Sequence, residues 1–238
     1  MISKLSFIKA KFIAFVILLF LSSIIIFNFN IFPEKLVNGS EFNENGQIFN
    51  YNLKISKISG KIHIDNNWTA TKNAGICTGN GTYSNPYIIE DLVINGGGSG
   101  SCIWIENSDV HFKIENCTLF NSGNYWDDSG IRLFFVRNAQ IINNTCLDNF
   151  YGIYISASSN NTISENIVNH NRDGIYLVGG AFNNISKNKA NHNIYFGITS
   201  YANQYNVITE NIVSNNIYGI ELEQSFNNTI SSNIMNKN

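Results

Sequence analysis

Proline is almost absent from this chain, which has two in 238 residues, Pro33 and Pro86. Proline lacks the backbone donor that helix interiors and central strands require. Everything after residue 86 can therefore hydrogen-bond its backbone without interruption, as a continuous sheet needs.

Charged residues are also scarce, at 13% of the chain, and the formal net charge is only -2. The chain therefore lacks the basic field of a nucleic-acid-binding protein, and nucleic acid is not expected as a partner. A disordered polar chain would be poor in apolar residues, whereas 44% of these residues are hydrophobic. The composition predicts a packed fold with a polar surface, large enough for one big domain or two small ones.

An uncharged apolar run at residues 12–27 follows three lysines near the N-terminus. No small residues of a signal-peptidase site follow it, which favours an uncleaved membrane anchor over a cleavable signal peptide. Lysines on the N-terminal side hold that end in the cytoplasm, so the rest of the chain is translocated. We expect an anchor or signal segment at 1–32, a linker at 33–60 and an extracytoplasmic main domain, secreted if the segment is cleaved.

The second half of the chain repeats itself. Its period, about 22 residues, is too short for the helix pairs of common α-solenoids. The Leu-x-x-Leu-x-Leu pattern of leucine-rich repeats is also absent. Apolar residues two apart, such as Ile153 and Ile155, predict a short strand after each glycine landmark. Five glycines, each followed by isoleucine, recur at spacings of 22, 22, 23 and 22 residues: Gly130, Gly152, Gly174, Gly197 and Gly219.

Each repeat is predicted to form one coil of a right-handed parallel β-helix, an all-β solenoid. We expect irregular N-terminal coils and a cap over 61–129 and regular coils over 130–238. The next glycine landmark would fall three residues beyond residue 238, so the last coil is expected to be incomplete, through truncation of the chain or a partner that covers the edge.

Asparagine recurs in step with the glycines. Equivalent residues of successive coils stack about 4.8 Å apart, so asparagines in one column form a ladder in which each amide donates to the next. Asparagine also tolerates left-handed backbone conformations, which suits the corners between strands. A second polar column is suggested by Asn149, Asn171 and Asn216. The predicted ladder consists of Asn144, Asn166, Asn188, Asn211 and Asn233.

The segments "GIYISASSNNTISEN" at 152–166 and "GIELEQSFNNTISSN" at 219–233 carry a resemblance to a known group. They resemble the parallel β-helix repeats of the NosD-like group, which are also described among carbohydrate-binding proteins and sugar hydrolases. The resemblance covers about residues 86 to 238, and setting Ile89 in register with Ile114 suggests that coils begin near residue 86. It implies a β-helix fold, with carbohydrate binding, carbohydrate cleavage or copper delivery as associated roles.

Four cysteines in an exported chain permit one or two disulfides in three connectivities. The absence of a Cys-x-x-Cys pair makes a zinc site unexpected. Cys146 aligns with an inward column of apolar residues and is expected to be a buried thiol. A disulfide between Cys77 and Cys102 is expected to close the irregular N-terminal coil.

Histidines supply the candidate metal site. His170 and His192 are 22 residues apart, and Asp148 and Asn215 fall in the same column. Two histidines at this spacing could share a metal ion, but without methionine or cysteine neighbours they are poor copper ligands. A solvent-facing turn column is the favoured interpretation, and no metal or cofactor is expected.

Carboxylates supply the candidate catalytic residues, since β-helix glycosidases and lyases cluster their acids on one outer face. Glu165 and Glu210 share a column, but Lys187 lies between them and indicates a charge ladder. Asp127 and Asp128 lie in a longer loop before the first regular coil. No arginine or histidine set accompanies these acids, so no catalytic residue is assigned.

Aromatic residues are the candidate ligand-binding groups. Tyr154 and Tyr176 follow inward isoleucines and are expected to point outward and stack. Tyr151, Phe196 and Tyr218 precede the glycines and form a neighbouring column. Exposed rings can hold sugar faces, although cross-strand aromatic pairs also stabilise sheets without a ligand. The candidate ligand-binding residues are Tyr151, Tyr154, Tyr176 and Tyr218.

Three hypotheses about function follow. The first is a membrane-anchored, non-catalytic surface module that binds carbohydrate or a cell-envelope protein. The second is a polysaccharide lyase or glycoside hydrolase. The third is a NosD-like accessory protein in copper delivery.

Overall fold

The computed structural model of the chain describes residues 40–42, 48–50 and 56–238. The membrane segment expected at 1–32 and most of the expected linker lie outside these residues. Strands β1 (Ser40–Phe42) and β2 (Ile48–Asn50) pair antiparallel and belong to a separate N-terminal unit. No helix in the described part of the chain is long and apolar enough to span a membrane.

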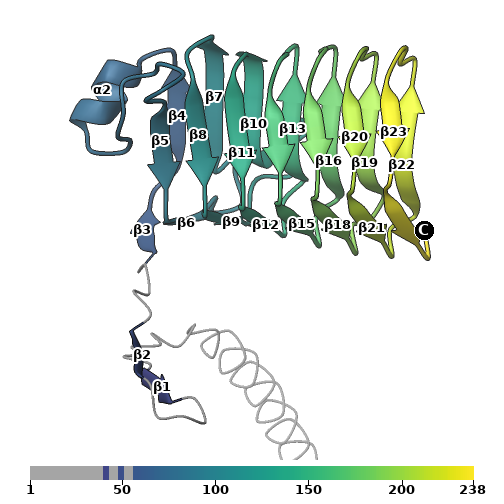
Figure 1. Cartoon of the computed structure of the whole chain (residues 1–238), viewed down its shortest axis with the longest axis horizontal. Coiled ribbons are helices and arrows are strands. Elements are labelled where there is room, and N and C mark those ends of the chain that lie inside the picture. The colour runs from purple at the N-terminus through teal and green to yellow at the C-terminus, as the bar shows by residue number, and fades with distance from the viewer. Residues whose placement is uncertain (1–39, 43–47, 51–55) are drawn as a thin grey trace, which may run out of the picture. The chain divides into compact units, whose positions relative to one another are not determined.

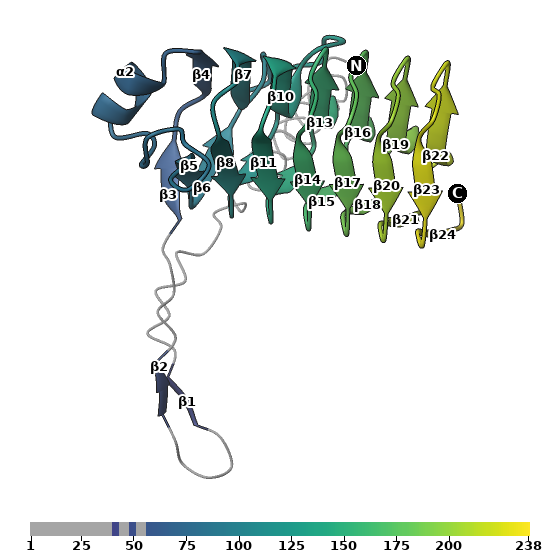
Figure 2. The same cartoon turned by 45° about the horizontal axis from the view of Figure 1, so that its top comes forward.

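Residues 56–238 belong to the second unit, a parallel β-helix in which three strands make up each coil. Figures 1 and 2 show the coils stacked side by side, from blue at the N-terminal end of the unit to yellow at the C-terminal end. Equivalent strands of successive coils pair in parallel and build three sheets, of seven, seven and eight strands. Along each coil the chain passes through the first, the second and then the third sheet.

The first sheet begins each coil and has the longest strands. It contains β4 (Ile62–Asp65), β7 (Ile103–Ser108), β10 (Ser129–Val136), β13 (Tyr151–Ser156), β16 (Asp173–Val178), β19 (Phe196–Tyr201) and β22 (Tyr218–Glu223).

The second sheet follows after a corner. It contains β5 (Tyr87–Glu90), β8 (Phe112–Glu115), β11 (Ala139–Ile142), β14 (Thr162–Ser164), β17 (Asn184–Ser186), β20 (Val207–Thr209) and β23 (Thr229–Ser231).

The third sheet closes the coil. It contains β3 (Lys57–Ser59), β6 (Leu92–Asn95), β9 (Thr118–Phe120), β12 (Thr145–Leu147), β15 (Ile167–Asn169), β18 (Lys189–Asn191), β21 (Ile212–Ser214) and β24 (Ile234–Asn236).

The strand register confirms the repeat that the glycines predict. Ile131 pairs with Ile153, which pairs with Ile175 on the next coil. The coils begin earlier than residue 86, because β4 already pairs in parallel with β7 and β3 with β6. This first coil falls largely within the irregular N-terminal coils expected over 61–129, but its register was placed too late because an insertion that includes helix α2 (Trp68–Asn73) separates its strands and obscures the period.

Helix α2 is tied to the first coils by one aromatic side chain. Trp68 is buried, stacks on Tyr87 with ring centroids 4.9 Å apart, and donates from Nε1 to the Ser108 hydroxyl at 2.8 Å. Its ring also contacts Phe112. The helix has only six residues, so this burial, rather than intrinsic helix propensity, accounts for its position.

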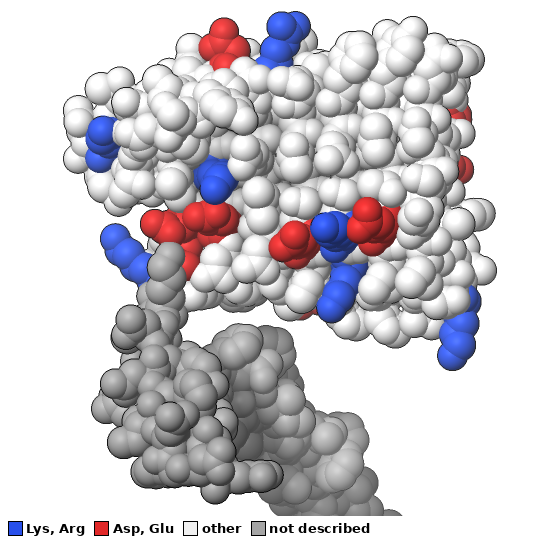
Figure 3. All heavy atoms as spheres, in the orientation of Figure 1, with Lys and Arg blue, Asp and Glu red and all other residues white. Residues whose placement is uncertain are grey.

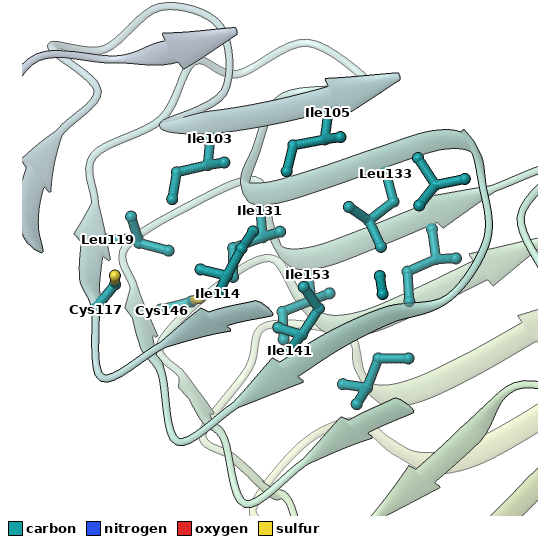
Figure 4. Packing of buried hydrophobic residues seen from close by; sticks show 14 of the residues in the cluster. Ile103, Ile105, Ile114, Cys117, Leu119, Ile131, Leu133, Ile141, Cys146 and Ile153 are labelled. Carbon is teal, nitrogen blue, oxygen red and sulfur yellow. The ribbon is translucent and has the colours of Figure 1, made fainter. Parts of the chain in front are cut away.

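The interior of the coils is a continuous column of branched aliphatic side chains. Figure 4 shows Ile131, Leu133, Ile141 and Ile153 pointing inward from their strands. These four are fully shielded from solvent. Each strand alternates inward and outward residues, so the same periodicity that fills the core also sets which side chains face outward.

Buried asparagines occupy the three corners of the coil. In the predicted ladder, the Asn166 side chain accepts from the Asn144 backbone N–H at 2.9 Å and donates to Asn188 Oδ1 at 2.9 Å. The second column is also a ladder, and it includes Asn193 between Asn171 and Asn216. A third ladder, which the sequence interpretation missed, consists of Asn161, Asn183, Asn206 and Asn228.

The left-handed residues at the corners are not the ladder asparagines themselves. The residue just before each ladder position has a positive φ, as in Glu165 at 59° and Lys187 at 59°. The expectation that ladder asparagines serve as the left-handed residues is therefore wrong. Their side chains hydrogen-bond the bent backbone, while the preceding residue makes the bend.

Candidate functional site

Aromatic side chains gather on the outer face of the first sheet. The strands of the second sheet carry Tyr87 and Phe112, both packed in the interior, and the third sheet carries Phe120. The first sheet differs because its outward positions repeat an aromatic residue on successive coils. We call this surface the aromatic face and define it by Trp104, Phe134, Tyr151, Tyr154, Tyr176, Phe196, Tyr201 and Tyr218.

The centre of the aromatic face is a packed group of three tyrosines. Tyr151 lies 5.0 Å from both Tyr154 and Tyr176, measured between ring centroids. Tyr154 points outward and pairs in register with Tyr176, as predicted. However, Tyr151 and Tyr154 are buried, with Tyr154 only 5% exposed, so the expectation that these two rings are exposed is wrong. The rings cover one another, while Tyr176 is half-buried and Tyr218 is exposed.

Glycine makes room for this tyrosine group to lie outside the coil. A Cβ at Gly152 would point inward and lie 2.6 Å from the Gly174 carbonyl oxygen and 2.9 Å from Asn171 Nδ2. With the inward space taken by the ladder, the preceding residue, Tyr151, turns outward onto Tyr154.

Arg132 and Trp104 extend the aromatic face toward the N-terminal coils. The Arg132 guanidinium lies 4.4 Å from the centroid of the Trp104 ring, whose other neighbour is His63 at 4.1 Å. Arg132 Nη1 pairs with Asp127 Oδ2 at 2.6 Å. Two buried donors here, Trp104 Nε1 and Arg132 Nε, have no hydrogen-bond partner among the described residues.

A second arginine–aspartate pair lies beside the tyrosines. Asp173 is buried, accepts from the Phe196 backbone N–H at 3.2 Å and pairs with Arg172 Nη1 at 2.8 Å. Burial raises the pKa of the Asp173 carboxyl, and the nearby Arg172 opposes this shift without cancelling it. The Arg172 guanidinium also lies over the rings of Phe150 and Tyr195.

Desolvation also acts on the neighbouring phenols. Burial raises the pKa of Tyr151 and of Tyr176 above the usual value, and the Asp173 carboxylate contributes in the same direction. Both hydroxyls therefore stay protonated at neutral pH and can donate as well as accept hydrogen bonds.

The sequence interpretation missed Asp173 and Arg172. Tyr151, Asp173 and Ser129 occupy equivalent register positions just before a glycine. A search of that column for polar residues, and not only for rings, would have found Asp173. Nothing in the repeat indicates that Arg172 turns back onto it.

The expected disulfide between Cys77 and Cys102 is absent, since both are free, buried thiols. Cys102 lies inside the coil, and its thiol donates to the Phe120 carbonyl at 3.4 Å. Burial raises the pKa of Cys102 and of Cys117 to about 11, and the pKa of Cys146 well above its usual value. These thiols are protonated and unreactive at neutral pH. Cys146 lies in the inward column, as predicted.

The histidine column is a corner, as the favoured interpretation has it. His170 and His192 stack with ring centroids 5.4 Å apart, and both have left-handed backbone conformations. Within the described residues no group of three or more histidine, cysteine, aspartate or glutamate side chains could hold a metal ion. The geometry therefore gives the copper-delivery hypothesis no specific support.

Two lysines on or next to the second sheet pair with carboxylates. Lys187 pairs with Glu210 at 3.9 Å, and Lys113 with Glu115 at 3.6 Å. On the face drawn in Figure 3, charged side chains are sparse, and acidic and basic atoms lie next to each other. Glu165, Lys187 and Glu210 therefore form a surface charge ladder, whereas Glu90 and Glu115 pair in register on neighbouring coils without an intervening lysine.

Of two shallow, open hollows, the first lies away from the aromatic face, whereas the second adjoins it through Phe135, whose ring centroid lies 4.3 Å from that of Phe134. The first is lined by Glu90, Glu115, Asn116, Ile142, Asn143 and Glu165, and the second by Asn66, Asn107, Ser108, Asp109, Phe135 and Arg137. Neither contains the paired arginines or the tyrosines, and both are mainly polar. We regard the aromatic face as the better candidate because it joins apolar rings, buried polar groups and a perturbed carboxyl in one place.

Comparison with known proteins gives the family and a set of distant structural neighbours. The periplasmic alginate epimerase AlgG, solved as a mutant, is 17% identical with a TM-score of 0.51 and covers 61% of this chain; the chain spans 45% of its length. The Dettilon tailspike protein is 16% identical with a TM-score of 0.49, covering 75% of this chain and 41% of the tailspike. The A-module of an Azotobacter vinelandii mannuronan C-5 epimerase is 14% identical with a TM-score of 0.47, covering 63% and 60%.

At these identities the neighbours show the fold alone. Among curated proteins, none matches the chain. The family described as the right handed beta helix region matches residues 52–205 and 101–238, which include all seven coils. The chain therefore belongs to the right-handed β-helix family.

Proposed function

We propose that this protein is a glycan-binding surface module whose aromatic face holds sugars. The observation that carries the proposal is the concentration of aromatic side chains and two arginine–aspartate pairs on one of three sheets. Sugars present apolar C–H faces and hydroxyl groups, which match ring surfaces and charged hydrogen-bonding groups respectively. The N-terminal segment, in this proposal, anchors the module to a membrane with the aromatic face outside the cell.

The structural neighbours support glycan binding by this fold but do not identify the glycan. The structural neighbour with a TM-score of 0.51 is an alginate epimerase, so a β-helix of similar shape accommodates a polysaccharide. A stack of parallel coils offers a long, regular surface that suits a repeating polymer. The aromatic face runs along this surface across six coils, from β7 to β22.

Glycan binding by the detergent-solubilised full chain tests the proposal. We expect saturable binding to a subset of an oligosaccharide array, weakened by Tyr176→Ala, which removes a half-buried ring of the face. The matched control is Phe120→Ala, an outward aromatic residue of the third sheet, and it should bind as the wild type does. Absence of binding by the folded wild type, or equal effects of the two substitutions, would overturn the proposal.

A second function, polysaccharide cleavage, is favoured by Asp173 and Tyr151. A buried carboxyl with a raised pKa can act as a general acid at mildly acidic pH. Incubation of the full chain with neutral and acidic polysaccharides should then release new reducing ends or unsaturated products. Asp173→Asn should abolish this release while preserving glycan binding; release that survives the substitution would exclude Asp173 as the acid.

A further inference from the structure

Most rings of the aromatic face are covered on at least one side by a neighbouring side chain. Trp104 is enclosed between His63 and Arg132. Tyr151 stacks on Tyr154 with an interplanar angle of 17°. Phe196 and Tyr218 form a further stack, 4.9 Å apart at 20°. A sugar ring that stacks on an aromatic residue needs an uncovered face, so these rings can contribute edges and hydroxyl groups more readily than flat platforms.

Uncovered rings lie instead in the loop between β9 and β10. Tyr125 is 78% exposed and Trp126 is 68% exposed. Neither ring makes an aromatic or cation–π contact with any residue that the structure describes. Two adjacent large rings left in water are the kind of feature that marks a binding surface.

This loop is held in place from several sides. Asp128 is buried, and its carboxylate accepts from the Tyr125 backbone N–H at 3.0 Å. The Asp128 carbonyl accepts from the Tyr151 backbone N–H at 3.1 Å, and Gly123 N–H donates to Gly100.

The ion pair between Asp127 and Arg132 ties the loop directly to the aromatic face. The two exposed rings are therefore presented by a fixed scaffold. Binding to them requires little additional ordering of the chain.

The charge of the surrounding surface discriminates between classes of glycan. Its two guanidinium groups, those of Arg132 and Arg172, are already paired with Asp127 and Asp173, while the loop adds a further carboxylate in Asp128. Acidic side chains exceed basic ones five to one on the strands of the first sheet, which carry Asp65, Glu106, Asp173, Glu221 and Glu223 against Arg132. A polyuronate would bring one negative charge per sugar to a surface that is already acidic.

We infer that the ligand is an uncharged glycan and that Trp126, with Tyr125, forms the platform on which one of its sugar rings stacks. The inference rests on the proposed glycan-binding function and names its substrate class and principal contact. It separates this chain from the alginate epimerase, whose name gives alginate as its substrate.

Titration of the full chain with neutral gluco-, manno- and galacto-oligosaccharides and with oligouronates of matched length tests both parts. We expect a neutral oligosaccharide to bind and the oligouronates to bind at least about tenfold more weakly. Added salt should strengthen the binding of the oligouronates because it screens their repulsion from the acidic surface. Trp126→Ala should weaken the binding of the neutral oligosaccharide about tenfold or more. Phe182→Ala is the matched control, since Phe182 is 63% exposed but lies at the corner between β16 and β17, outside the loop, and it should leave the affinity for the glycan unchanged.

Preference for oligouronates would overturn the substrate class. Equal affinities of the Trp126→Ala and Phe182→Ala variants would show that Trp126 does not form the platform for a sugar ring. If Tyr176→Ala loses glycan binding and Trp126→Ala does not, the role of Trp126 as the platform is wrong, while the proposed glycan-binding function is retained. If no glycan binds the folded wild type, the proposed function fails and this inference fails with it.

Discussion

Each ladder asparagine uses both ends of its amide. Asn166 Oδ1 accepts from the Asn144 backbone N–H and side chain, while its Nδ2 donates to the Ile141 carbonyl and to Asn188. The side chain is fully buried. No other uncharged side chain of this size offers a donor and an acceptor in one plane to the coil above and the coil below.

Asn166→Ala should therefore be strongly destabilising. The substitution leaves a buried N–H and a buried C=O without partners, at about 1–3 kcal/mol for each unsatisfied group. We expect the free energy of unfolding to fall by about 3 kcal/mol in urea denaturation of the full chain. The control Asn184→Ala removes an exposed strand asparagine and should stay within about 0.5 kcal/mol. Similar losses from the two variants would contradict the role of the ladder.

Single residues also mark where prediction from the sequence succeeded and where it could not. The ladder asparagines and the inward isoleucines were predictable because they depend on position within a strict repeat. The burial of Tyr154 was not, because it depends on the rotamers of Tyr151 and Tyr176, which a repeat pattern leaves open. The absence of the disulfide was also not predictable from the spacing of the cysteines. The strand register places Cys102 inside the coil, and the spacing alone does not reveal this.

At the scale of the element, the start of each first-sheet strand from β10 onward combines a glycine, a ladder asparagine and an outward residue. Gly152, Gly174 and Gly197 each lie beneath the carbonyl oxygen of the next glycine, with a ladder amide alongside. None of these three has a positive φ, so space rather than backbone conformation requires glycine there.

Gly152→Ala should destabilise the chain by about 1–3 kcal/mol because its Cβ overpacks this junction. The neighbours are backbone and a buried amide, which cannot move aside at low cost. Thermal unfolding of Gly60→Ala supplies the control, since nothing lies within 4 Å of a Cβ at Gly60. A Gly152→Ala variant as stable as the wild type would show that the junction has free space.

Asp173 gives the first sheet a dependence on pH. Its pKa is higher in the folded chain than the usual value of about 3.9, so the folded state binds the proton more tightly than the unfolded state. The stability that the protonated carboxyl contributes is present below the unfolded pKa and is lost as pH rises through the folded pKa.

Asp173→Asn should remove this loss while keeping an acceptor for the Phe196 N–H. We expect the difference in unfolding free energy between variant and wild type to shift in favour of the variant from about pH 4 to about pH 7. Arg172 loses its partner, but its side chain is 39% exposed and can be solvated. A difference that stays constant, or that shifts toward the wild type with rising pH, would contradict the direction assigned to this pKa.

At the scale of the whole molecule, the repeat explains the architecture but not the site. The parallel coils, their three sheets and the inward columns all follow from residues at equivalent positions. Departures from the repeat carry the features proposed for function: Arg172 and Asp173 differ from their counterparts, and the loop with Trp126 interrupts the regular spacing. The register of the first coil was placed too late for the same reason, because the insertion around α2 breaks the period.

The proposed function requires glycans to bind the aromatic face and its loop. Hydrogen–deuterium exchange of the detergent-solubilised full chain, with and without the tightest-binding neutral oligosaccharide, tests it most directly. We expect slower exchange in peptides covering residues 121–134, 151–156 and 173–178, with no change in peptides from the second and third sheets. Protection on those sheets instead, or no protection at a saturating concentration of the oligosaccharide, would contradict it.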